Sequence, residues 1–336
     1  MKYGDLRKKT FRPLEFLIEQ AIHVVAFFSL AFIVLIFVFI FREAYSIFSP
    51  QETTETVNEP METYGEEALS DGWVDHQTAE LEEESTASFK NIFDKEWVPV
   101  SLNPQYGIWP LLLGSLKVAF IAILISAPIA ILAALYTSTF ASSKVKEIVK
   151  PAVEILAGFP SVVIGFFALI VLASLVQSVF GLQYRLNAFV GGLALSIAII
   201  PVIFTISEDA LNAVPRSFTE ASLALGAEKW ETALFVVLPA AMPGIFAAVL
   251  LGVGRAIGET MIVLMATGNA AFASLNPFEP IRTMSATIGA EMAEVVFGDF
   301  HYSVLFFIGT ILFAISFAIN LTAETVVRRL VMRRFR

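Results

Sequence analysis

Six long apolar stretches constrain the fold of this chain more than any other feature. A helix needs about 20 consecutive apolar residues to cross the hydrocarbon core of a bilayer. Hydrophobic residues make up 57% of the 336 residues and charged residues only 16%, against about a quarter charged in an ordinary soluble domain. We therefore predict an all-α polytopic membrane protein with six transmembrane helices. The expected spans are residues 18–41, 109–136, 152–180, 187–206, 241–266 and 302–325.

The distribution of lysine and arginine predicts how these helices are oriented. Basic residues in short connections mark the cytoplasmic side of a membrane, and here they gather at both termini and after the second span. Alternation over six spans places these three segments on one side, so both termini are expected to be cytoplasmic. The expected organisation is a cytoplasmic N-terminus (1–17), a first accessory helix (18–41), an external loop (42–108), a transmembrane domain (109–327) and a basic cytoplasmic tail (328–336).

The external loop is strongly acidic. Fifteen acidic residues lie between Glu43 and Gly107, against two lysines. Low hydrophobicity and dense like charge cannot bury enough apolar surface to offset the entropy of ordering. Residues 50–90 are therefore predicted to be a disordered, solvated loop; the alternative is a site for a cation or a partner protein.

Motifs of the common enzyme classes are absent from the sequence. It contains neither a G-x-x-x-x-G-K-[ST] phosphate loop nor a G-x-S-x-G nucleophile elbow. There is no cysteine, and His23, His76 and His301 lack the spacing of metal ligands. We therefore expect no catalytic site, metal or cofactor in this chain, and any energy source must be another protein.

A polar but regular segment separates the fourth and fifth spans. Residues 208–235 are predicted to form a helical hairpin, with a capping box from Ser217 to Glu220. Gly226 suits the left-handed position that ends a helix. This first helix either covers its own bundle or docks on a cytoplasmic partner. The residues that recur on one of its faces are Phe218, Ala221, Ser222 and Leu225.

The sequence GVGRAIGET, residues 252–260, places two charges inside the apolar fifth span. Arg255 lies about 18 Å beyond the start of the span near Pro243, close to the middle of a bilayer. A charge there costs about 2.5–3.5 kcal/mol. Because residues four apart share a helical face, Arg255 and Glu259 are expected to meet and partly neutralise each other. The pair either joins helices or lines a solute path, where a guanidinium matches an oxyanion.

Small residues on the same span predict close helix packing. Gly254 and Gly258 form a G-x-x-x-G pattern, which lets two membrane helices approach closely. A second row of small residues consists of Gly244, Ala248 and Gly252.

A proline in the third span predicts a bend. Pro160 and Ser161 follow Gly158, and a proline inside a helix removes one backbone hydrogen bond. The bend is either an ordinary membrane-helix kink or a hinge used in gating.

The sequence EASLALGAEKWETALFVVLP, residues 220–239, resembles the EAA motif of ABC importer permeases, E-A-A-x3-G-x9-I-x-L-P. In that family this segment is the coupling helix that fits a groove in the ATP-binding subunit. The resemblance therefore implies a type I ABC importer (MetI-like) permease core, with ATP and Mg bound by the partner ATPase. The motif positions are Glu220, Ala221, Gly226, Leu238 and Pro239, with Ser222 in place of the third alanine and Val236 in place of the isoleucine.

Four further segments resemble phosphate-specific permeases, and the first of them is GRAIGETMIVLMATGN at residues 254–269. The others are residues 95–116, 154–166 and 199–215. The tryptophan-containing segment before the second span and the extra first helix favour the PstC type over its PstA-type partner. In the family the matching arginine and glutamate are implicated in phosphate passage. The expected substrate path therefore contains Arg255, Glu259 and the adjacent Thr260.

The resemblance implies a permease subunit of an ATP-driven phosphate importer, located in the cell membrane. The implied partners are a PstA-type homologous permease, two copies of a PstB-type ATP-binding subunit, a PstS-type external phosphate-binding protein and the lipid bilayer; no nucleic acid is expected. Three alternatives remain open. They are a permease of the same fold for molybdate, sulfate or an amino acid, an autonomous carrier or channel, and a membrane scaffold for phosphate sensing.

Overall fold

The computed structural model of the protein describes residues 13–48, 92, 94–101, 104–271 and 273–334. The predicted disordered segment 50–90 lies outside these residues. Within them, six helices are long and apolar enough to cross a membrane, which agrees with the six predicted spans. These helices are Leu17–Phe48, Ile108–Phe140, Ser161–Phe180, Ala188–Asn212, Lys229–Gly258 and Phe300–Thr325.

Within the described residues, the regular elements are helices and one short antiparallel hairpin outside the spans. The elements before the second span are α1 (Pro13–Tyr45), the 3-10 helix η1 (Ser46–Phe48) and the strands β1 (Trp97–Val98) and β2 (Gln105–Tyr106). The elements that follow are α2 (Ile108–Leu135), the π-helix η3 (Tyr136–Phe140), α3 (Ser143–Ala157), α4 (Ser161–Phe167), the π-helix η4 (Ala168–Leu172), α5 (Ala173–Phe180), α6 (Ala188–Asn212), α7 (Arg216–Ala224), α8 (Lys229–Thr232), the π-helix η5 (Ala233–Val237), α9 (Leu238–Gly258), α10 (Met261–Ala266), α11 (Met284–Glu291) and α12 (Phe300–Arg334).

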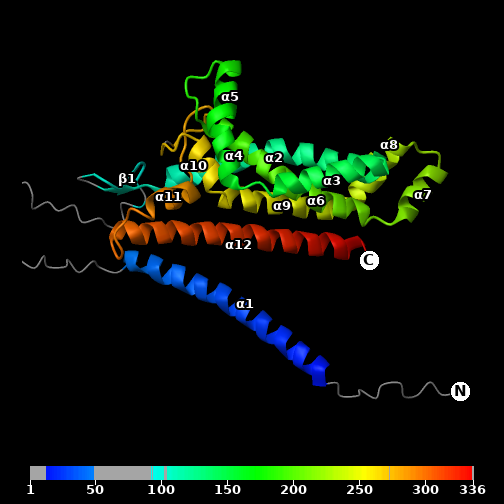
Figure 1. The fold of residues 1–336 in the computed structure, drawn as a ribbon, viewed down its shortest axis with the longest axis horizontal. Coiled ribbons are helices and arrows are strands. Elements are labelled where there is room, and N and C mark those ends of the chain that lie inside the picture. The colour runs from blue at the N-terminus through cyan, green and yellow to red at the C-terminus, as the bar shows by residue number, and fades with distance from the viewer. Residues whose placement is uncertain (1–12, 49–91, 93, 102–103, 272, 335–336) are drawn as a thin grey trace, which may run out of the picture.

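Different elements lie at the two ends of the molecule. Figure 1 shows the start of α1, the end of α12 and the α7–α8 hairpin at one end, with β1 and α11 at the other. Helices α2, α6 and α9 pack against one another in the middle, and α12 packs on α9. The accessory helix α1 packs on α12, where Phe37 contacts Phe313 and Phe39 contacts Phe306.

Small residues allow α6 and α9 to approach closely. A Cβ atom on Gly252 would lie 2.9 Å from Ile203 Cδ1, and one on Gly244 would collide with Ala210. The predicted row of small residues therefore faces α6. The predicted G-x-x-x-G contact is found only in part within the described residues: a Cβ built on Gly254 would lie 3.8 Å from Asn320 Oδ1 on α12, whereas no described atom lies within 4 Å of one built on Gly258.

The third predicted span, 152–180, is two helices that meet at a break. Helix α3 ends at Ala157 and α4 begins at Ser161, so the chain bends at the predicted position before Pro160. Proline lacks an N–H group and disfavours a helical conformation at the residue before it, which explains the break. In Figure 1, α5 turns away from the direction of α2, α6 and α9. A hinge role for Pro160 and Ser161 stays a prediction.

The fifth predicted span, 241–266, is also wrong as a single helix. The helical segment begins earlier, at α8, and α9 ends at Gly258 before α10 starts at Met261. The segment expected to be a connecting loop, 267–301, contains α11, most of whose residues are buried. Both differences leave backbone N–H and C=O groups without helical partners next to apolar helices. Other parts of the chain must therefore form hydrogen bonds with these groups.

Candidate functional site

Glu259 lies at the break between α9 and α10. It has an extended backbone conformation (φ −72°, ψ 129°), and Leu264 N–H donates to Thr260 O at 2.9 Å to begin α10. The prediction that Arg255 and Glu259 meet on one helical face is therefore wrong. The two side chains form no ion pair, although both residues lie in the described part of the chain.

Arg255 occupies the last turn of α9, and its side chain is exposed. No ion-pair or hydrogen-bond partner for it exists among the described residues. Glu259 and Thr260, which follow four and five residues later, are half-buried. A charged side chain at membrane depth must face protein or water rather than lipid. This face of α9 is therefore suited to a water-filled cavity or to another protein subunit.

Helix α11 packs across the break. The Ser285 hydroxyl donates to the Glu259 carbonyl oxygen at 2.7 Å, and a Cβ atom on Gly289 would collide with Thr260. Thr283 caps α11 by accepting from Ala286 N–H at 3.2 Å. Sequence reasoning missed this helix; a threonine directly before Met284, as an N-cap signal, could have indicated its start.

The helix break before Pro160 is linked to the same region. Helix α4 packs against α10, and a Cβ atom on Gly165 would lie 3.0 Å from Met265 Sδ and 3.1 Å from Met261 O. The contact between α4 and α10 therefore connects the break before Pro160 with the break at Glu259.

The α7–α8 hairpin contains the predicted motif residues from Glu220 to Gly226. Gly226 has a φ of +92°, and its N–H donates to Leu223 O at 3.0 Å, while Ala227 N–H donates to Ser222 O at 3.3 Å. These two bonds form a Schellman motif. The predicted left-handed end of the helix at Gly226 is confirmed.

The predicted capping box at Ser217 and Glu220 is wrong. Helix α7 starts directly after Pro215 without a side-chain cap, because a proline fixes the entry to the helix by itself. A capping box is present one helix later, where Glu231 accepts from Glu228 N–H at 2.8 Å.

The hairpin exposes several large apolar side chains. Phe218 is 51% exposed, Leu225 90% and Trp230 48%, and none of the described residues of α7 is buried. Helix α7 therefore does not cover its own bundle. The Ser222 and Thr232 hydroxyls share a hydrogen bond of 2.9 Å that fixes α7 against α8.

The other motif residues lie around the hairpin. Glu220 and Ala221 are exposed on α7. Leu238 and Pro239 begin α9 directly after the π-helix η5, inside a helical segment that starts at α8, so Pro239 removes one N–H donor from a continuing helix. The motif residues thus share one end of the molecule, whereas Arg255, Glu259 and Thr260 lie at the far end of α9.

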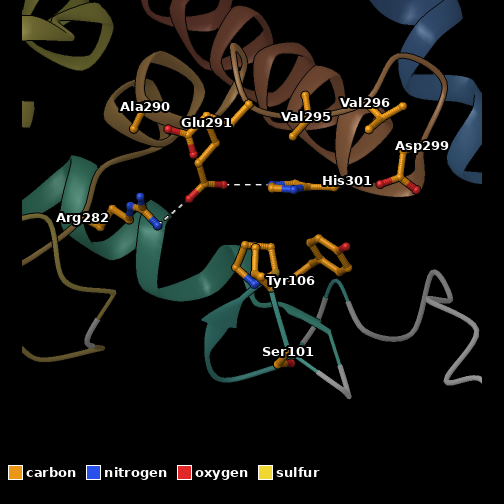
Figure 2. A pocket seen from close by; sticks show the side chains of 12 residues that line it. Ser101, Tyr106, Arg282, Ala290, Glu291, Val295, Val296, Asp299 and His301 are labelled. Atoms are coloured by element: carbon orange, nitrogen blue, oxygen red, sulfur yellow. Dashed lines mark hydrogen bonds and ion pairs between the residues drawn. The ribbon is translucent and has the colours of Figure 1, made fainter. Parts of the chain in front are cut away.

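A second polar site lies at the opposite end and was not predicted from the sequence. Glu291 lies beside a cavity of about 690 Å³ that Figure 2 shows from close by. Its carboxylate accepts from Trp97 Nε1 at 3.0 and 3.2 Å and from His301 Nε2 at 2.9 Å, and it forms an ion pair with Arg282, in which Nη1 lies 2.6 Å from Oε1. Arg282, Glu291 and His301 lie in one stretch of the chain. Trp97 lies 194 positions before Glu291, so no local pattern could indicate the complete cluster.

The environment of Glu291 changes its acidity. Burial alone would raise the pKa of the carboxyl, but the hydrogen bond from His301, the Arg282 guanidinium and the Trp97 indole together lower this pKa below its ordinary value. Nearby, burial and the charges of Asp299 and Glu291 raise the pKa of Tyr106 to about 12. Glu291 is therefore a carboxylate, and Tyr106 a neutral phenol, at neutral pH.

Comparison with known families identifies the family of this chain. Residues 126–332 match the family model described as "Binding-protein-dependent transport system inner membrane component". The chain belongs to this permease family. It is therefore a multi-pass membrane protein and a subunit of an inner-membrane transport system.

Two relatives show how similar the permease is to curated members. It is 35% identical over 221 residues to the "Probable ABC transporter permease protein YqgH" of Bacillus subtilis, over 66% of this chain and 72% of that protein. It is 34% identical over 265 residues to the "Phosphate transport system permease protein PstC" of Mesorhizobium japonicum, over 73% of this chain and 80% of that protein.

Solved structures support the fold of the permease. An inward-facing MetNI methionine ABC transporter chain matches with a TM-score of 0.50 at 20% identity, over 66% of this chain and 94% of that chain. A bacterial ABC transporter for the acidic polysaccharide alginate matches with a TM-score of 0.50 at 14% identity, over 74% of this chain and 85% of that chain. The predicted fold, a MetI-like type I importer core preceded by an accessory helix, is confirmed.

Proposed function

We propose that this permease is a subunit of an ATP-driven phosphate importer and that Arg255 provides a transient positive charge for the anion. The observation that carries this proposal is an exposed arginine, without a partner among the described residues, next to a break in a membrane helix. The names of several relatives support phosphate as the solute, and the PstC of Mesorhizobium japonicum is one of them.

The geometry around Arg255 suits passage rather than tight binding. A guanidinium presents paired donors that match a phosphate oxyanion. Arg255 also lies in the last turn of α9, where the negative end of the helix dipole reduces its net attraction for an anion. Glu259 follows four residues later and repels the anion once it has moved on. Thr260 adds a hydroxyl to the same path.

The α7–α8 hairpin is the proposed contact with the energy source. Its exposed Phe218, Leu225 and Trp230 form an apolar surface that suits a groove in an ATP-binding subunit. Two copies of that subunit, of the PstB type, would bind ATP and Mg, and this chain would bind neither. A PstA-type permease would complete the path, and a PstS-type protein would deliver phosphate from outside. Both termini and the hairpin would then be cytoplasmic.

The Arg255→Gln variant tests the role of the cation. In the assembled transporter, loss of a charge-assisted hydrogen bond should lower radiolabelled phosphate uptake by about tenfold or more. Arg255→Lys keeps the charge but loses the paired donors, so its uptake should be intermediate. The matched control is Arg185→Gln. Arg185 lies in the short turn after α5, and its exposed guanidinium donates to Leu169 O.

Competition with unlabelled sulfate and molybdate in the same assay identifies the solute. Phosphate alone should compete with the labelled phosphate. Full uptake by Arg255→Gln would contradict the proposed role of the arginine, and equal competition by sulfate would favour a permease for another oxyanion.

A further inference from the structure

The carbonyl group of Glu259 has left the helical hydrogen-bond ladder. In a continuous helix it would accept from the N–H of residue 263, four positions on. The extended backbone of Glu259 ends α9, and Leu264 N–H donates instead to Thr260 O, so the next ladder starts one residue later. The Glu259 carbonyl accepts from the Ser285 hydroxyl, at 2.7 Å.

This replacement matters because of where it occurs. A backbone carbonyl at membrane depth without a partner costs several kcal/mol, since no water or lipid group replaces the lost bond. Ser285 is 6% exposed and lies in the first turn of α11, 26 residues further along the chain. The hydroxyl therefore stabilises the broken form of the span relative to a continuous helix.

Further contacts hold the Ser285 hydroxyl and the far end of its helix. Its oxygen lies 3.3 Å from Thr283 Oγ1, and Thr283 also caps α11. The other end of α11 is Glu291, which Trp97, Arg282 and His301 hold. Helix α11 is thus a rigid connection of about 10 Å between the Glu291 cluster and the break.

We propose that Ser285 is a positioning residue for transport: by holding the break between α9 and α10, it keeps Glu259 away from Arg255. This inference rests on the proposed role of Arg255 in phosphate passage. In a continuous helix the two residues would share a face and form an ion pair. That pair would occupy the guanidinium and compete with the anion. The break leaves the guanidinium available.

Ser285→Ala in the assembled transporter, reconstituted in liposomes, is the first test. Phosphate uptake should fall about three- to tenfold, the loss expected from one hydrogen bond. Ser285→Thr keeps the hydroxyl and should retain most of the uptake. The matched control is Ser196→Ala, because the equally buried Ser196 hydroxyl donates to Leu193 O within its own helix.

A distance measurement reports on the break without depending on transport. The chain contains no cysteine, so spin labels can be attached at Leu251→Cys on α9 and Leu264→Cys on α10. Thirteen residues of continuous helix would separate the two backbone positions by about 20 Å. Ser285→Ala should shift the label distance toward that of the continuous helix, and Ser196→Ala should not.

A double-mutant cycle separates positioning from simple stabilisation. If Ser285 acts by keeping the Glu259 carboxylate away from Arg255, Ser285→Ala should cause no further loss of uptake in a Glu259→Gln background. Additive losses, or unchanged uptake and label distance in Ser285→Ala, would overturn the inference. Full uptake by Arg255→Gln would instead overturn the proposed function, so the two failures are distinguishable.

Discussion

At the scale of single residues, Glu291 makes the most contacts that depend on charge. Its carboxylate joins β1, α12 and the segment before α11 through Trp97, His301 and Arg282. A buried carboxylate with several donors stabilises the folded chain only while it is ionised. The end of the permease that contains β1 and α11 should therefore be sensitive to acid.

The pKa of Glu291 is lowered in the folded chain from the ordinary value of 4.5. A lowered folded-state pKa gives stability that is fully present above the unfolded pKa and is lost as the pH falls through the folded pKa. We expect the thermal unfolding midpoint of the purified permease to be insensitive to this group from pH 7 to about pH 5 and to fall below about pH 4.5.

Glu291→Gln should remove that part of the acid sensitivity and lower stability at pH 7 by about 1–3 kcal/mol. Glu294→Gln is the control, because Glu294 lines the same cavity but is exposed. An unchanged midpoint for Glu291→Gln at pH 7 would show that the cluster does not stabilise the chain.

Some single-residue features could be predicted from the sequence and others could not. The left-handed conformation of Gly226 follows from local backbone sterics, which depend on a few neighbouring residues. The separation of Arg255 from Glu259 depends on Ser285, far along the chain, which competes for the Glu259 carbonyl. Helical periodicity contains no information about such a partner.

At the scale of elements, the α7–α8 hairpin is a small unit with its own internal bonds. The Schellman motif ends α7 at Gly226, and the bond between Ser222 and Thr232 fixes the angle between the two helices. The apolar surface of the hairpin therefore has a defined shape before any partner binds.

Gly226→Ala should disturb that shape. Placing a Cβ atom at a φ of +92° costs about 1–2 kcal/mol, so the hairpin should lose its defined conformation. We expect a reduced ratio of phosphate uptake to ATP hydrolysis in the reconstituted transporter. Gly226→Asn should restore much of the ratio, because asparagine tolerates the left-handed region. A normal ratio in Gly226→Ala would show that the end of α7 does not contribute to coupling.

The elements themselves were predicted more accurately than their interruptions. Hydropathy identified six spans because a helix that crosses a bilayer core pairs most of its backbone groups internally and needs about 20 apolar residues. Proline chemistry predicted the bend before Pro160. The break at Glu259 and the three π-helices among the described residues were not indicated by hydropathy, which reports only the length and apolarity of a segment.

At the scale of the whole molecule, six spans place the start of α1, the end of α12 and the hairpin at one end. The acidic segment 50–90 follows the first span and should therefore emerge on the opposite side. The number of spans fixes this relation, and the basic residues near the termini predict that the shared side is the cytoplasm.

Labelling of single cysteines tests this topology, because the natural chain has none. Ser70→Cys, in the acidic segment, should react with a membrane-impermeant maleimide in intact cells. Leu225→Cys, at the 90% exposed end of α7, should react only after the membrane is permeabilised. Labelling of Leu225→Cys in intact cells, with Ser70→Cys protected, would reverse the proposed orientation.

The π-helix η5, just before Pro239, has a consequence for the angular relation between the two ends of this span. A π-turn contains one residue more than an α-turn, and each residue of an α-helix turns the chain by about 100°. Because the wider π-turn takes up its extra residue within one turn, deleting one residue from Ala233–Val237 would restore a regular α-helix and leave α9 facing nearly the same direction relative to α8. The π-turn therefore lets the segment near the hairpin contain one extra residue while the Arg255 side chain, about 30 Å away, keeps its direction.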